Sequence, residues 1–145
     1  MHCEKKSMQS SKILKKNKIP IYSFDLFGIE PDYGWYGLIL PIIKEIYIYN
    51  EKHPNEKIHI IQIEEKFGSL RMHTTKAPDY IEAMISKAAC ASEHTCEKCG
   101  AKGIKYELDG WNQTLCEKHF IAKKDADMDD ELCDFVYNIY LTNSN

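Results

Sequence analysis

Three cysteines and one histidine in the C-terminal third of the chain have the spacing of a metal site. Cys96 and Cys99 form a Cys-x2-Cys pair, and Cys116 and His119 form a Cys-x2-His pair after sixteen intervening residues. Thiolates and imidazoles are the ligands that zinc prefers, and two such pairs supply the four donors of a tetrahedral site. Because protein atoms take every position of the metal, we predict one structural Zn²⁺ with no place for a catalytic water.

The residues around these four predict how the chain brings them together. Gly100 follows the first pair and allows a tight turn in which backbone N–H groups approach the sulfurs. Asp109-Gly110 is a two-residue hairpin signal between IKYEL and WNQTL. The second pair runs into HFIAKK, which favours a helix whose first turn presents Cys116 and His119 on one side. A knuckle, a hairpin and a ligand-bearing helix in this order resemble a treble-clef zinc finger.

The part of the chain before the finger predicts an α+β fold. Residues 35–50 are apolar almost all round, which indicates a helix that is either buried or shared between the core and a partner surface, so its aromatic residues are candidates for both. We expect the helix to begin near Pro41, because proline beyond the first turn removes a backbone hydrogen bond. Alternating apolar residues at 58–64 and 69–75 predict a β-hairpin. Helix signals follow over residues 78–92, so we expect the hairpin to pack against two helices.

Charge divides the chain into segments. Residues 1–18 contain six lysines and one glutamate, so the net charge of −3 leaves −8 for the remaining 127 residues. We predict a flexible basic tail over 1–18, an α+β core over 19–94, the zinc finger over 95–124 and an amphipathic, acidic-capped C-terminal helix over 125–145. A basic arm that binds nucleic acid is the alternative interpretation of the tail.

Cysteine content and hydropathy predict the compartment. Cys3, Cys90 and Cys133 remain after the metal ligands, and an odd remainder favours a reducing environment over a disulfide framework. No apolar run follows the N-terminal lysines, and none reaches the roughly 18 residues of a membrane span. We therefore expect a soluble, cytoplasmic protein.

Three segments of the chain resemble an uncharacterised family of small bacterial and phage proteins; they read GWYGLILPIIKEI, IQIEEKFGSLRMHT and CEKCG…GW…TLCEKH. In that family a Gly-Trp helix start, a Lys-Phe-Gly-x-Leu-Arg hairpin and a C-terminal Cys-x2-Cys-Gly/Cys-x2-His zinc finger recur in this order. The resemblance covers roughly residues 34–120 and implies an architecture and a zinc site, but no reaction. For a phage protein, the compartment is the host cytoplasm. The matching positions are Gly34, Trp35, Lys66, Phe67, Gly68, Leu70, Arg71, the four zinc ligands, Gly110 and Trp111.

We predict a non-enzymatic, zinc-stabilised module that binds a protein partner. The sequence shows no nucleophile with an orienting base and no metal site with an exchangeable position. The acidic body disfavours polyanion binding, whereas aromatic side chains suit a protein interface. The candidate partner-binding residues are Trp35, Tyr36, Lys66, Phe67, Arg71, Asp129, Asp130 and Glu131.

Other functions remain open. A nuclease of the treble-clef type would need a second, catalytic cation, and the finger hairpin offers Glu107 and Asp109 but no histidine base. The phage resemblance suggests a specific form of protein binding, the inhibition of a host defence or nucleic-acid enzyme by carboxylates placed where phosphates bind. Nucleic-acid binding by the lysine-rich tail would extend to basic residues of the hairpin and finger, namely Lys66, Arg71, Lys98, Lys102 and Lys105.

Overall fold

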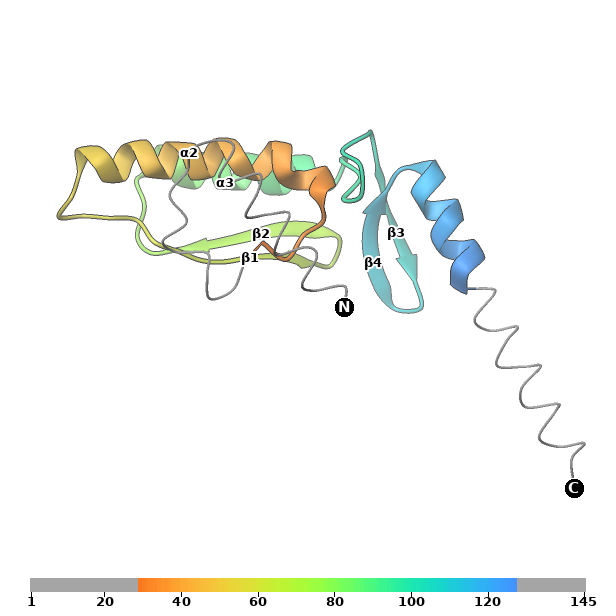
Figure 1. Ribbon diagram of the computed structural model, residues 1–145. Coiled ribbons are helices and arrows are strands. Elements are labelled where there is room, and N and C mark those ends of the chain that lie inside the picture. Colours follow the sequence, from red (N-terminus) through yellow and green to blue (C-terminus); the bar gives the residue numbers. More distant parts are fainter. Residues whose placement is uncertain (1–28, 128–145) are drawn as a thin grey trace, which may run out of the picture.

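Helices and hairpins alternate in the part of the chain that the computed structural model describes, residues 29–127 (Figure 1). The fold is α+β, as predicted, and its strands form two antiparallel hairpins, β1–β2 and β3–β4. A further helix covers residues 117–127. The other elements in chain order are η1 (Tyr33–Trp35), α2 (Tyr36–Lys52), β1 (Ile60–Lys66), β2 (Ser69–Thr74), α3 (Asp79–Ser92), β3 (Ile104–Leu108) and β4 (Trp111–Leu115). The predicted basic tail lies outside the described residues.

Helix α2 begins at Tyr36, five residues before the expected start at Pro41. Pro41 and Gly37 both lie on the exposed side of the helix. The Gly37 carbonyl, which loses its donor at Pro41, can therefore be hydrated, so the proline is tolerated inside the helix. The buried residues recur at helical spacing and face the hairpin; they are Ile39, Ile42, Ile43 and Ile46.

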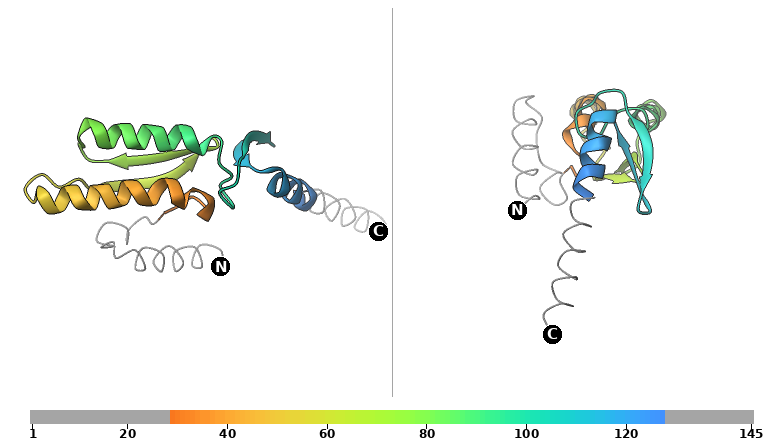
Figure 2. Two further views of the ribbon diagram at one scale, coloured as in Figure 1. Left: turned by 90° about the horizontal axis from the view of Figure 1, so that it is seen from above. Right: turned by 90° about the vertical axis from the view of Figure 1, so that its right-hand side faces the viewer.

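The hairpin β1–β2 and the two long helices enclose the apolar core. Helices α2 and α3 lie side by side over one face of this hairpin (Figures 1 and 2). Ile63 of β1 pairs with Met72 of β2, and both side chains are buried beneath the helices. Ile39, Ile63 and Ile81 are at most 1% exposed. Burial of each such side chain stabilises the fold by about 1.5–3 kcal/mol.

Helix α3 closes one edge of the β1–β2 hairpin. Its N-cap is Pro78, and Asp79 and Glu82 lie in the first turn, where carboxylates oppose the positive end of the helix dipole. At its other end the Ser92 hydroxyl accepts a 2.8 Å hydrogen bond from the Leu70 backbone N–H. This bond satisfies a strand-edge donor that β1 does not reach, and it ends α3 beside the finger.

The finger consists of the hairpin β3–β4 and the helix over residues 117–127, which stand beside the core in Figure 1. Asp109 and Gly110 form the predicted turn, with φ of 50° and 78°, as a two-residue hairpin turn requires. Tyr106 of β3 stacks on Phe120 of the helix, with ring centroids 3.9 Å apart. The helix continues without interruption through Asp125, so the prediction that a new helix begins there is wrong.

Two further observations complete the fold. Among the described helices, none has the length and apolar content needed to cross a membrane. The remainder of the predicted C-terminal helix, from residue 128 onward, lies outside the described residues.

Candidate metal centre

Cys96 and Cys99 lie in a tight knuckle between α3 and β3. The Cys96 N–H donates to the Ala101 carbonyl at 2.7 Å, and the Gly100 N–H donates to the Cys96 carbonyl at 2.8 Å. Gly100 has φ of +79°, which a residue with a side chain adopts only at a cost. The knuckle therefore brings the two sulfurs to one side, as the spacing predicts.

Cys116 and His119 belong to the start of the helix over residues 117–127. Cys116 ends the connection from β4 and precedes the first helical residue, and its carbonyl accepts the helical bond from the Phe120 N–H at 2.9 Å. His119 lies one turn further along the same side of the helix. The two ligands are thus held by a helix terminus whose free N–H groups favour negative charge.

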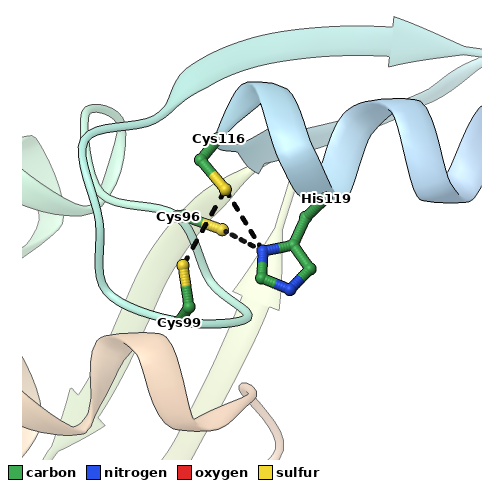
Figure 3. Close-up of side chains that lie close together, drawn as sticks. All are labelled: Cys96, Cys99, Cys116 and His119. Atoms are coloured by element: carbon green, nitrogen blue, oxygen red, sulfur yellow. Dashed lines mark hydrogen bonds between the residues drawn. The ribbon is translucent and has the colours of Figure 1, made fainter.

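The four donor atoms point toward one another, as Figure 3 shows. Cys99 Sγ lies 3.8 Å from Cys116 Sγ, and Cys96 Sγ lies 3.5 Å from His119 Nδ1. A tetrahedral zinc with bonds of about 2.3 Å to sulfur and about 2.05 Å to nitrogen has edges of about 3.8 Å and about 3.6 Å. All four donors lie within 4.8 Å of one another. Cys116 Sγ lies 3.2 Å from His119 Nδ1, so the spacings scatter about these edges and the cluster could hold a tetrahedral metal ion.

The local electrostatics favour thiolate at Cys116. A hydrogen bond from the His119 backbone N–H, together with the imidazole of the same residue, lowers the pKa of the Cys116 thiol to about 6. At Cys99 the Ala101 N–H acts to lower the pKa, but lost hydration and the neighbouring thiols outweigh it, so the pKa is raised. Neighbouring thiolates repel each other, which disfavours the charged form of Cys99. A cation bound between the sulfurs would offset this repulsion and hold Cys99 and Cys116 as thiolates.

The donor set fits a metal ion bound by protein alone. Within residues 29–127, Cys96, Cys99, Cys116 and His119 form the one group of His, Cys, Asp or Glu side chains that could hold an ion. Three sulfurs and one imidazole nitrogen complete a tetrahedron without water. The geometry therefore agrees with the four predicted ligands and with a closed site.

Gly34 and Trp35 fasten the knuckle to the core. The Gly34 N–H donates to the Glu97 carbonyl at 2.8 Å, and the Trp35 indole N–H donates to the Thr95 carbonyl at 2.7 Å. A Cβ at Gly34 would lie 2.0 Å from the Cys96 carbonyl oxygen, so only glycine fits there. The Gly-Trp pair thus serves as the docking point for the loop that carries Cys96 and Cys99.

A second set of contacts joins the finger to the turn of the first hairpin. The buried Thr114 hydroxyl of β4 donates to the Gly68 carbonyl at 2.7 Å. The Lys105 ammonium lies 3.1 Å from a carboxylate oxygen of Glu93 and 3.2 Å from the Ser69 hydroxyl. Sequence reasoning missed Thr114, because a threonine in a short strand carries no signal of such a distant contact.

The structure separates the predicted partner-binding residues into three groups. Trp35 and Tyr36 are buried, at 0% and 6% exposed, so their placement on a partner surface is wrong: both pack in the core. Lys66, Phe67 and Arg71 are exposed on the first hairpin, and their role stays a prediction. Asp129, Asp130 and Glu131 lie outside the described residues.

Phe67 has an unusual backbone for its size. It occupies the first position of the β1–β2 turn with φ of +54°, and 65% of it is exposed. The left-handed region suits Gly, Asn and Asp and is strained for a bulky side chain. The Phe67 ring has the Lys66 ammonium 5.7 Å from its centroid, and a role of Phe67 in partner binding stays a prediction.

Two of the basic residues considered for nucleic-acid binding are neutralised within the molecule. Lys98 forms an ion pair with Asp32, and Lys105 forms one with Glu93. Both lysines therefore brace the finger against the core, which leaves fewer cations for phosphate contacts.

No protein-family model matches the chain, and no curated protein or solved structure matches it either. The family membership expected from three sequence segments stays a prediction. The features of the molecule that bear on function are therefore the four donor residues, their attachment to the core and the surfaces around them.

Proposed function

We propose that this chain is a non-enzymatic, zinc-stabilised module that binds a protein partner. The convergence of Cys96, Cys99, Cys116 and His119 on a space of tetrahedral dimensions carries the proposal. Three thiolates and an imidazole favour zinc among the common metals, and a full set of protein ligands leaves no position for substrate or water. The metal's role is then to hold the finger in shape.

The finger has little else to hold it together. Among the described residues, its buried apolar side chains are Cys96 and Leu115, whereas Ile104 and Trp111 are 61% and 71% exposed. So few buried groups cannot offset the conformational entropy lost on ordering roughly 30 residues. Metal binding supplies the missing free energy, as in other small zinc-dependent folds.

The exposed apolar side chains support a protein partner. Trp111 and Ile104 project from the finger, and Phe67 projects from the turn that the finger contacts. Aromatic anchors of this kind dominate protein interfaces. The ion pairs of Lys98 and Lys105 weaken the competing nucleic-acid interpretation. Protein binding would include inhibition of a host enzyme, a possibility that only the family resemblance suggests.

Metal analysis and cobalt substitution test the closed site. We expect one zinc per chain, and the cobalt form should show the visible absorption of tetrahedral thiolate coordination. Added azide or imidazole should leave that spectrum unchanged, because no position is free to exchange. A folded, zinc-free protein, or a spectrum that shifts with added ligand, contradicts a structural site.

Affinity capture tests the binding function. Immobilised protein should retain a specific protein from a cell lysate, or the chain itself, and Trp111→Ser should reduce that retention. Tyr80→Ser is the matched control, because Tyr80 is also exposed, at 48%, but lies on α3 away from the finger. Retention that Trp111→Ser leaves unchanged argues against the finger surface as the binding site.

A further inference from the structure

An apolar groove runs along the finger between β3 and the helix over residues 117–127. Its volume is about 530 Å³. Ile104 and Ile121 flank it and are 61% and 49% exposed. In Figure 1 the helix lies on the far side of the β3–β4 hairpin from the core. The apolar lining of the groove is formed by Ile104, Tyr106, Leu115, Phe120 and Ile121.

The walls of the groove depend on the metal centre. Cys116 itself lines the groove, between Leu115 at the end of β4 and the first turn of the helix. Tyr106 and Phe120 stack across the floor with their planes 15° apart. Because Cys116 and His119 fix the start of the helix, the metal sets the distance between the two walls. The groove is therefore a surface that exists only in the metal-bound finger.

The sequence that follows residue 127 has the chemistry of an occupant. Residues 128–145 contain four acidic residues and no lysine or arginine, whereas the finger over residues 95–124 contains six lysines and four acidic residues. Two of the six lysines, Lys98 and Lys105, are already paired with Asp32 and Glu93, which leaves four for a partner. Opposite charges of this kind guide two surfaces together. The same C-terminal stretch has apolar residues at helical spacing, which predicts that they share one side of a helix; they are Leu132, Phe135, Val136, Ile139 and Tyr140.

The direction of the helix decides which molecule can receive this segment. The helix over residues 117–127 starts beside the β3–β4 hairpin and leads the chain away from it, as Figure 1 shows. No glycine or proline occurs after Gly110, so the sequence has no strong signal for the sharp reversal that would return the segment to its own groove. A groove on a second molecule can receive it without any reversal.

We propose that residues 128–145 of one copy of this chain bind in the finger groove of a second copy, so that two copies exchange C-terminal segments. The proposal rests on the metal-stabilised binding module proposed above, and it names a second copy as the partner. Ile104 and Ile121 then lie against the apolar side of the partner's segment, and the acidic residues of that segment face the lysines of the finger. Because each copy offers both a groove and a segment, the contact is reciprocal and closes as a dimer.

Sedimentation analysis of the full-length, zinc-loaded chain tests the dimer. We expect a concentration-dependent dimer in the wild type. Ile121→Asp, in the groove, and Phe135→Asp, in the segment, should each weaken dimerisation by about tenfold or more, because either aspartate would be buried without a partner. Tyr80→Asp is the control and should leave the dimer intact, because Tyr80 is exposed on α3, outside the groove.

Mixing the two variants sharpens the test. Ile121→Asp retains an intact segment and Phe135→Asp an intact groove, so the mixture should form a one-to-one complex that neither forms alone. A synthetic peptide of residues 128–145 should bind the Phe135→Asp protein, and the same peptide with Phe135→Asp should not. Phe135 lies outside the finger, so this arm remains informative even if Ile121→Asp disturbs folding.

Several outcomes overturn the exchange. They are a wild type that stays monomeric at every concentration, a dimer that survives both substitutions, or a peptide that fails to bind the open groove. Zinc content measured on every sample separates this proposal from the preceding one. A monomer that retains one zinc per chain contradicts only the exchange, whereas a folded protein without zinc contradicts the metal-stabilised module itself.

Discussion

The core and the finger of this protein hold their shapes by different means. In the core, large side chains from α2, α3 and the β1–β2 hairpin fill a shared apolar interior, with Trp35, Ile39 and Ile81 fully buried. The finger buries few apolar groups and instead gathers four metal donors at the ends of a knuckle and a helix. If the proposed metal binds, one part of this small chain is stable by packing while the adjacent part depends on ligation.

The contact between the two regions is polar and close. It consists of hydrogen bonds to carbonyl groups, the Lys98–Asp32 and Lys105–Glu93 ion pairs and the backbone approach at Gly34. Such contacts fix orientation but bury little apolar area. Loss of the metal should therefore release the finger without unfolding the core, and the substitutions below test how far the two regions are independent.

The largest expected effect is the loss of a metal ligand. Cys116→Ser should abolish stoichiometric metal binding and unfold the finger, because apparent binding free energies of structural zinc are about 10–16 kcal/mol. Metal content and amide hydrogen exchange check this, with protection lost in residues 95–127 and kept in α2. Cys90→Ser is the control, since Cys90 lies exposed on α3. A Cys116→Ser protein with one tightly bound zinc would show that the cluster is not the site.

The opposite test creates a cavity in the core. Ile39→Ala should lower the free energy of unfolding by about 2–5 kcal/mol, because Ile39 is 0% exposed and its neighbours cannot fill the space. Chemical denaturation measures this, with the exposed Lys44→Ala as a control that should change stability by less than about 0.5 kcal/mol. Zinc content should be unchanged in folded Ile39→Ala; a parallel loss of metal would mean that the regions fold as one unit.

Two glycines three positions apart in the chain, Gly34 and Gly37, test the junction itself. Gly34→Ala should cost about 1–3 kcal/mol or detach the knuckle, because its Cβ would lie 2.0 Å from the Cys96 carbonyl oxygen. Gly37→Ala meets nothing within 4 Å in an exposed turn of α2, and it should stabilise the protein by about 1 kcal/mol. Thermal unfolding of the pair checks the contrast. Equal changes in melting temperature for the two substitutions would contradict the close contact between Gly34 and the Cys96 carbonyl.

A smaller effect is expected at the two hairpin turns. Phe67→Asn should raise the free energy of unfolding by about 1 kcal/mol, because asparagine tolerates the left-handed backbone that strains phenylalanine. Asp109→Asn should change little, since the corresponding position of the finger turn already has a suitable residue. Denaturant titration measures both. If Phe67 contacts a partner, the stabilised variant should also bind that partner more weakly.

The smallest expected effect is the pH dependence of the Glu93 contact. Hydrogen bonds from Ser69 and Lys105 lower the pKa of Glu93 below its usual 4.5. The stabilisation that the ionised Glu93 provides is therefore complete above pH 4.5, and it is lost as the pH falls through the lowered pKa of Glu93. The side chain is 44% exposed, so the contribution is below about 1 kcal/mol. Glu93→Gln should show a shallower acid loss of stability than wild type; identical pH profiles would contradict this.

The features that sequence predicted well are those set by local chemistry. Cys-x2-Cys, Cys-x2-His and Asp109-Gly110 each specify a turn or a helix start within a few residues, and the structure forms them as expected. The alternation in residues 58–75 likewise predicted the first hairpin to within two residues. Local signals of this kind do not depend on the rest of the fold.

The sequence-based predictions failed where contacts between residues far apart in the chain determine the structure. The sequence leaves Trp35 open between a partner surface and the core, because the Thr95 carbonyl that gives its indole a buried partner lies 60 residues away. The start of α2 was placed too late, because the sequence cannot show that the Gly37 carbonyl faces water. The groove on the finger was also missed, since Ile104 and Ile121 are far apart in the chain.

The indole of Trp35 gives the protein a built-in optical signal. It is enclosed by the core, yet its N–H contacts the metal-binding knuckle, whereas the other tryptophan, Trp111, is open to water. The two rings should emit at different wavelengths, with the blue component belonging to Trp35. Chelation that loosens the knuckle would shift that component to the red, so the intrinsic fluorescence of the unlabelled chain can report metal release as it occurs.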